Sequence, residues 1–189
     1  LSESRTLPRA YFKGLNLLLN DQPDKAIDAF IEIVTLDPET ADMHFALGNL
    51  FRRRGEIERA IRVHQNLLAR PDLPLDQRAQ AQYELGMDYL KAGLLDRAEE
   101  TFNGLVDGSY SVQAQRALLE IYLREKEWSR AIDAAAGLQS SGAGARQKEI
   151  AQFYCELAQD ALVHMDTANA MSLLDKSLHA DRKNVRATM

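Results

Sequence analysis

The sequence has a single cysteine, Cys155, among its 189 residues. One thiol forms no intrachain disulfide and does not supply the several thiolates of a cysteine-based zinc site. Hydrophobic runs are short, since no stretch approaches the roughly 18 consecutive apolar residues of a membrane-spanning helix. The 23 Lys and Arg against 28 Asp and Glu give a net charge of −5, which argues against general affinity for nucleic acid. These absences predict a soluble piece whose chemistry is binding.

The two ends of the sequence look like cut ends. The chain opens at Leu1 rather than Met and shows no pattern of a secretory signal peptide. It stops at Met189 shortly after a segment that reads as the beginning of a helix, without a helix stop signal. We therefore interpret the sequence as a fragment of a longer protein.

Small residues recur along the chain with a period close to 34. Gly14 and Gly48 lie 34 residues apart, and so do Ala26 and Ala60. Later members of the two series are Gly86, Ala98, Ala131 and Ala170. Small residues at two fixed places in a 34-residue period are the signature of tetratricopeptide helix hairpins. The sequence predicts an all-α fold, a right-handed tetratricopeptide solenoid of about five repeats plus the start of a sixth.

The spacing of the apolar residues places the helices of each hairpin. The first helices are predicted near 8–20, 40–54, 76–92, 111–125 and 147–164. Their partners are predicted near 23–36, 56–69, 94–106, 127–138 and 166–179. The repeats of this single array are expected near 7–40, 41–74, 79–110, 112–145 and 147–183, with a sixth starting at 184–189.

No set of side chains indicates catalysis or metal binding. The four histidines lack metal-ligand spacing: His44, His64, His164 and His179. Residues 140–145 contain glycine but lack the Gly-Lys-Ser/Thr ending of a phosphate-binding loop. Cys155 lies inside a predicted helix, where a packed small side chain is favoured over a reactive thiol. We predict a protein that is not an enzyme and a fragment without cofactor or metal.

In the tetratricopeptide motif, the first helix of each hairpin lines the concave face through a few fixed positions. Here those positions carry aromatic residues beside Arg, Lys and Asn, a composition typical of protein-binding surfaces. The candidate partner-binding residues are Tyr11, Leu15, Phe45, Asn49, Arg52, Arg53, Tyr83, Met87, Lys91, Arg116 and Arg124. The alternative for any single aromatic residue is packing against a neighbouring repeat.

An arginine cluster stands out against the acidic background. Between positions 49 and 64 the chain carries five arginines and two glutamates: Arg52, Arg53, Arg54, Arg59, Arg62, Glu56 and Glu58. Arginine holds carboxylates and phosphates in bidentate fashion, which favours an acidic protein segment or an anionic lipid surface as partner. The alternative is a solvated helix face on which Glu58 and Arg62 form an ordinary pair.

Several strings carry a more specific resemblance. Gly48–Gln65, Leu85–Tyr89, Ala92–Glu99 and Glu149–Ala158 resemble the lipopolysaccharide assembly protein B family of Gram-negative bacteria. The first and last of these strings are far more specific than the general tetratricopeptide consensus, and the resemblance covers essentially the whole chain.

That resemblance implies an adaptor at the cytoplasmic face of the inner membrane. Members carry an N-terminal membrane helix and a C-terminal rubredoxin-like knuckle for iron or zinc, both absent from this sequence. The expected partners are the deacetylase that commits lipid A synthesis, a membrane AAA+ protease that degrades it, and a membrane regulator of lipopolysaccharide synthesis. The sequence leaves two alternatives open: a homodimer, and a general peptide-binding module of the co-chaperone or secretion-scaffold kind, to which Asn49 and Lys91 would contribute.

Overall fold

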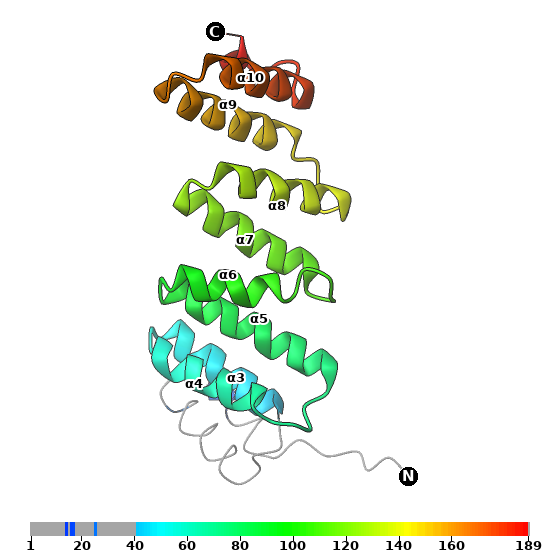
Figure 1. Cartoon of the computed structure of the whole chain (residues 1–189). Helices are drawn as coiled ribbons and strands as arrows, with labels where there is room; N and C mark the ends of the chain where they lie inside the picture. The colour runs from blue at the N-terminus through cyan, green and yellow to red at the C-terminus, as the bar shows by residue number, and fades with distance from the viewer. Residues whose placement is uncertain (1–13, 15, 18–24, 26–40, 189) are drawn as a thin grey trace. The chain divides into compact units, whose positions relative to one another are not determined.

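The computed structural model describes residues 14, 16, 17, 25 and 41–188, and within them every regular element is a helix (Figure 1). The chain forms two compact units, residues 1–101 and 102–189. In the part of the chain that the structure describes, no helix is both long and apolar enough to cross a membrane. Each unit is built from helix hairpins.

The first unit contains α3 (Ala41–Arg53), α4 (Ile57–Leu68), α5 (Leu75–Lys91) and most of α6 (Leu95–Asn103). Helix α4 packs against both α3 and α5, and α3 also contacts α5.

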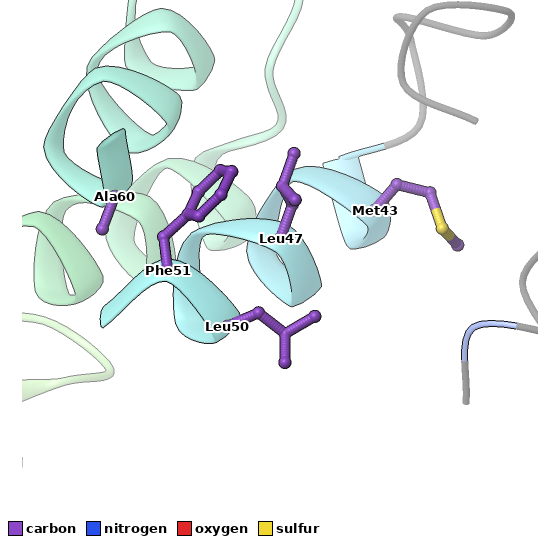
Figure 2. Close-up of a cluster of buried hydrophobic side chains, with 5 residues drawn as sticks. All are labelled: Met43, Leu47, Leu50, Phe51 and Ala60. Carbon is purple, nitrogen blue, oxygen red and sulfur yellow. The ribbon is translucent and has the colours of Figure 1, made fainter. Parts of the chain in front are cut away.

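A buried apolar cluster joins α3 to α4. Figure 2 shows Met43, Leu47, Leu50 and Phe51 projecting from α3, with Ala60 of α4 completing the cluster. The spacing of three or four residues brings the α3 side chains to one stripe of the helix. Ala60 is fully buried, and its small side chain lets the two helices approach each other closely.

The second unit contains α7 (Ser111–Glu125), α8 (Trp128–Ser140), α9 (Gln147–Val163), α10 (Thr167–Ala180) and a short 3₁₀ helix, η1 (Val185–Ala187). Helix α8 packs against α7 and α9, and α10 packs against α9 and η1. Ala158, Ala161 and Ala170 line the α9–α10 contact, so that small side chains again mark the close approach.

Four turns between paired helices share one backbone geometry. A residue with positive φ follows the first helix: Gly55 (81°), Gly93 (74°), Lys126 (58°) and Met165 (60°). The next amide donates to the carbonyl five residues earlier, as from Glu56 N to Phe51 O at 2.8 Å. This bond closes the helix end. Glycine adopts the left-handed conformation without steric cost, whereas lysine and methionine are strained there.

Three hairpins repeat a cation–π contact next to this turn. The guanidinium carbon of Arg59 lies 4.1 Å from the ring centroid of Phe51, and Arg97 and Arg130 lie 5.4 Å and 4.4 Å from the rings of Tyr89 and Tyr122. In each pair the aromatic residue belongs to the first helix and the arginine to the second. In each of these hairpins the aromatic residue lies four positions before the positive-φ residue and the arginine four positions after it. In the α9–α10 hairpin the same two positions hold Ala161 and Asn169, which cannot form a cation–π pair.

The structure confirms the helices predicted for the described part of the chain. Helix α7 has the predicted bounds, and α9 ends one residue before its predicted end. The prediction was wrong for the end of α6, which stops at Asn103 rather than near residue 106. Gly104 follows directly, and turns fill residues 104–110. The helices predicted near 8–20 and 23–36 lie almost wholly outside the described residues, and the repeat bounds stay predictions.

Candidate partner-binding surface

A network of polar and charged side chains, completely buried at its centre, ties together α3, α4 and α5 of the first unit. His64 Nδ1 on α4 lies 2.5 Å from Asp88 Oδ2 on α5, and both side chains are completely buried. The other carboxylate oxygen, Asp88 Oδ1, accepts a hydrogen bond from Arg52 Nη1 of α3 at 2.9 Å. One carboxylate therefore bridges two other helices.

The Arg52 guanidinium has further partners within the unit. Its Nη1 donates to the Glu84 carbonyl oxygen at 3.0 Å, and its Nη2 donates to Glu84 Oε2 at 2.5 Å and to Asn49 Oδ1. Burial lowers the pKa of Arg52, but the hydrogen bonds and negative charges of Glu84 and Asp88 outweigh it and raise that pKa. Two of the candidate partner-binding residues, Asn49 and Arg52, thus contact each other, and their polar groups are held by this chain's own residues.

A close approach of helices accommodates the His64 ring. A methyl group built on Gly48 would lie 2.4 Å from His64 Nε2 and 2.5 Å from Cε1, too close for any side chain. The His64 ring also faces Phe45, with ring centroids 6.3 Å apart. Phe45 itself is only 5% exposed and packs with Ala41, Leu67, Leu73 and Ala81. The structure therefore favours the packing alternative for this aromatic residue.

Two other candidates of the first unit lie exposed on neighbouring helices. Arg53 in the last turn of α3 and Lys91 in the last turn of α5 are open to solvent. Among the described residues neither has an ion-pair partner. Tyr83 and Met87, also on α5, are half-buried. The first unit thus presents two exposed cations without an ion pair in its described part, on helices that contact each other.

The remaining candidates lie elsewhere in the chain. Arg116 and Arg124 are exposed on α7 in the second unit, where Arg124 pairs with Glu120 at 2.5 Å. Tyr11 and Leu15 lie outside the described residues. The partner-binding role of the candidate residues stays a prediction.

Much of the arginine cluster is neutralised within the chain. Glu56 Oε1 lies 3.3 Å from Arg54 Nε, and Glu56 Oε2 accepts from Arg59 Nη1 at 2.7 Å. Arg52 is engaged by the buried network. Arg53 and Arg62 are left as exposed arginines of the cluster without an ion pair in the described region. The cluster is therefore a weaker cationic patch than its sequence indicates.

Sequence reasoning missed three members of the buried network, His64, Glu84 and Asp88. Asp88 gave the only usable signal, because it interrupts the apolar run from Leu85 to Leu90. A charged residue on the buried face of a helix needs a partner, and the sequence does not say which.

The single cysteine lies in a small buried polar cluster of the second unit. Its Sγ is 3.3 Å from Ser177 Oγ, which donates to the Ala151 carbonyl oxygen at 2.8 Å and accepts from Asn184 Nδ2 at 3.0 Å. Cys155 is 4% exposed, in agreement with the packed side chain predicted for it. Across the described part of the chain, no group of three or more His, Cys, Asp or Glu side chains is suited to hold a metal ion.

Successive hairpins with small residues at the helix contacts and a recurring closing turn define a helical-repeat protein. A model of the tetratricopeptide repeat family matches residues 13–82 and 83–146, and the chain belongs to this family.

Two relatives are similar to this chain over nearly its whole length. The chain is 44% identical over 188 residues to lipopolysaccharide assembly protein B of Escherichia coli K12, covering 99% of this chain and 48% of that protein. It is 35% identical over 195 residues to the protein of the same name from Haemophilus influenzae Rd, covering 98% and 49%. The chain spans about half the length of these relatives. The resemblance that the sequence strings indicated is confirmed.

Solved structures share the fold. YrrB, a tetratricopeptide repeat protein with an unusual peptide-binding site, superposes with a TM-score of 0.60 at 14% identity, covering 95% of this chain and 88% of that one. The protein MamA superposes with a TM-score of 0.63 at 18% identity, covering 95% and 94%. At these identities the likeness shows the fold alone, and it confirms the tetratricopeptide fold class.

Proposed function

We propose that this chain is the protein-binding repeat part of a non-catalytic adaptor in lipopolysaccharide assembly. The observation that carries the proposal is its 44% identity, over 99% of its length, to a protein named for that process. In the finer form of the proposal, the adaptor holds the deacetylase that commits lipid A synthesis close to a membrane AAA+ protease. Such a scaffold raises the local concentration of substrate at the protease without chemistry of its own.

The parent protein would act at the cytoplasmic face of the inner membrane. A membrane helix and a metal-binding knuckle of the parent protein, and a contact with a membrane regulator of lipopolysaccharide synthesis, belong to the same proposal. This chain would contribute a surface for protein partners.

Within the first unit, the exposed cations Arg53 and Lys91 are the residues best suited to contact a partner. They have no ion-pair partner in the described structure and project from helices α3 and α5, which contact each other. The part-buried bridge from Arg52 to Glu84 and Asp88 fixes these two helices to each other. The spacing of the two cations is therefore set before a partner arrives, which lowers the entropic cost of binding. An acidic segment of the partner would complement them.

The test is titration of this chain with the purified deacetylase at low and at high salt. We expect saturable binding that weakens with salt, because exposed charges are screened. The double variant Arg53→Glu/Lys91→Glu should bind about tenfold more weakly, since each reversed exposed charge costs up to about 1 kcal/mol. Its melting temperature should stay unchanged.

The matched control is Arg62→Glu/Lys176→Glu, which changes the net charge equally on exposed residues of α4 and α10. If both double variants weakened deacetylase binding equally, the effect would come from net charge alone. The α3–α5 surface would then no longer be part of the proposal. A folded chain that does not bind the deacetylase at all would contradict substrate capture by this half of the protein.

A further inference from the structure

The α9–α10 hairpin tip, defined as residues 160–171, exposes an unusual set of apolar side chains. Leu162 is 52% exposed, Val163 73%, Met165 89% and Met171 70%. They lie in the last turn of α9, the connecting turn and the first two turns of α10. The other large exposed hydrophobic residues described are dispersed along the chain: Leu75, Leu94, Leu123 and Val185. Single exposed apolar residues are ordinary, whereas a group at one tip indicates a contact surface.

The tip differs from the other hairpins in the side chains at three positions around the turn. The residue two positions before the positive-φ residue is basic in the first three described hairpins: Arg53, Lys91 and Arg124. In the α9–α10 hairpin this residue is Val163. At the positive-φ position itself the first three have Gly55, Gly93 and Lys126, where the fourth has Met165. The arginine that covers an aromatic ring in each of those three hairpins is replaced by Asn169.

Met165 combines backbone strain with exposure. Its φ of 60° lies in the left-handed region that disfavours side chains with a Cβ, and its side chain is almost fully open to solvent. Folding therefore gains little from this methionine in the isolated chain. Lys126 shares this backbone strain, so what sets Met165 apart is an exposed apolar side chain at the strained position.

Charge indicates what kind of partner fits. From residue 157 to residue 175 the chain carries Asp160, Asp166 and Asp175 and no Lys or Arg. Asp160 and Asp166 flank Leu162, Val163 and Met165 in the sequence. Asp166 Oδ1 accepts from the Asn169 amide at 3.1 Å, which leaves its negative charge without a cationic partner among the described residues. An anionic membrane surface would be repelled by this rim, and a basic segment would be attracted.

We infer that the α9–α10 hairpin tip docks an amphipathic, basic segment of a partner protein. Apolar side chains of that segment cover Leu162, Val163 and Met165, and its flanking Lys or Arg residues face Asp160 and Asp166. This inference goes beyond the proposed function, because it concerns the second unit and a partner of opposite charge to the one proposed for Arg53 and Lys91.

The probe is a fluorescent synthetic helical peptide with Leu and Met on one face and Lys on its flanks, compared with the same peptide carrying Glu in place of Lys. Anisotropy titrations use the whole 189-residue chain. We expect saturable binding of the Lys peptide that weakens with salt, and at least about tenfold weaker binding of the Glu peptide.

Two variants separate docking from folding. Met165→Gly removes the exposed side chain while giving the turn the residue that its backbone favours, so the chain stays folded and affinity falls about tenfold. Val163→Arg restores the basic residue of the other hairpins and should weaken the Lys peptide further. The control Leu75→Ser changes an 85% exposed apolar residue in the first unit and should leave affinity unchanged.

Several results would overturn the inference. Equal affinity of the Lys and Glu peptides would remove the acidic rim from the account, and unchanged affinity in Met165→Gly would remove the apolar patch. A doubling of mass in sedimentation that Met165→Gly abolishes would assign the tip to self-association instead. Binding to anionic lipid vesicles that the same variant abolishes would assign it to a membrane surface.

Discussion

At the scale of single residues, the first unit depends on a glycine and a carboxylate. Gly48 leaves the space that the buried His64 ring occupies, and Asp88 links that ring to Arg52. A Cβ on Gly48 would meet the His64 ring at 2.4 Å, and the Asp88 side chain is completely buried, so neither site accommodates a change easily.

Gly48→Ala should lower the free energy of unfolding by about 1–2 kcal/mol. Overpacking costs about 1–3 kcal/mol, and the higher helix propensity of alanine returns at most about 1 kcal/mol. Urea denaturation measures the difference. The control is Gly137→Ala in α8, where the new methyl would meet the flexible end of Gln115, so stability should stay the same or rise. A neutral Gly48→Ala would show that the His64 ring moves aside freely.

Asp88→Asn should destabilise the chain by about 1–3 kcal/mol, because the completely buried carboxylate that bonds both Arg52 and His64 becomes an uncharged amide, while Glu84 still pairs with Arg52. The shape is nearly unchanged, so the loss reports charge rather than packing. Glu84→Gln provides the comparison: its side chain is 15% exposed, and the loss should be smaller. Guanidinium denaturation of both variants decides the point. Equal losses would contradict the central position of Asp88 in the network.

At the scale of helices and turns, the hairpin is the unit of repetition. Gly55 and Gly93 occupy the positive-φ position of their turns without strain, and Lys126 and Met165 occupy it with strain. The backbone hydrogen bond that closes the helix is nevertheless the same, 2.9 Å from Glu127 N to Tyr122 O and from Asp166 N to Ala161 O. The turn geometry is therefore dictated by helix packing, and the residue at the turn adapts to it.

Lys126→Gly should stabilise the chain by about 0.5–1 kcal/mol. Relief of the left-handed strain, about 1–2 kcal/mol, exceeds the entropy that glycine adds to the unfolded chain, about 0.4–1 kcal/mol. Thermal melts followed by circular dichroism give the sign. The reverse change, Gly93→Ala, meets no atom within 4 Å but keeps a φ of 74°, so it should destabilise. A rise in stability there would show that this turn tolerates a Cβ.

The helices were predictable and the buried network was not, for physical reasons. Helices follow from local apolar spacing, and the tight turns follow from Gly55 and Gly93. The network joins residues 24, 32 and 36 positions apart on three helices, and no local pattern pairs Arg52 with Glu84 or Asp88. Phe45 shares the position of groove-lining aromatics in the motif, but Leu73 and Ala81 cover it.

At the scale of the whole molecule, stability in a repeat protein is a sum of local terms. Each hairpin is stabilised mainly by its neighbours, so a defect weakens the region around it more than distant repeats. The chain separates into two compact units, and the buried charge network belongs entirely to the first. The candidate surface at Arg53 and Lys91 and the α9–α10 hairpin tip therefore lie in units with different cores.

Hydrogen exchange of Gly48→Ala tests this separation. The new methyl strains the contact of α3 with α4, and α5 is tied to both through Asp88. Amides of α3, α4 and α5 should exchange about tenfold faster, the factor that corresponds to about 1.4 kcal/mol in an opening equilibrium, while α9 and α10 keep their protection. Gly137→Ala should leave α3 to α5 unaffected. Uniform acceleration of all helices in Gly48→Ala would contradict this separation and mean that the two units unfold as one cooperative body.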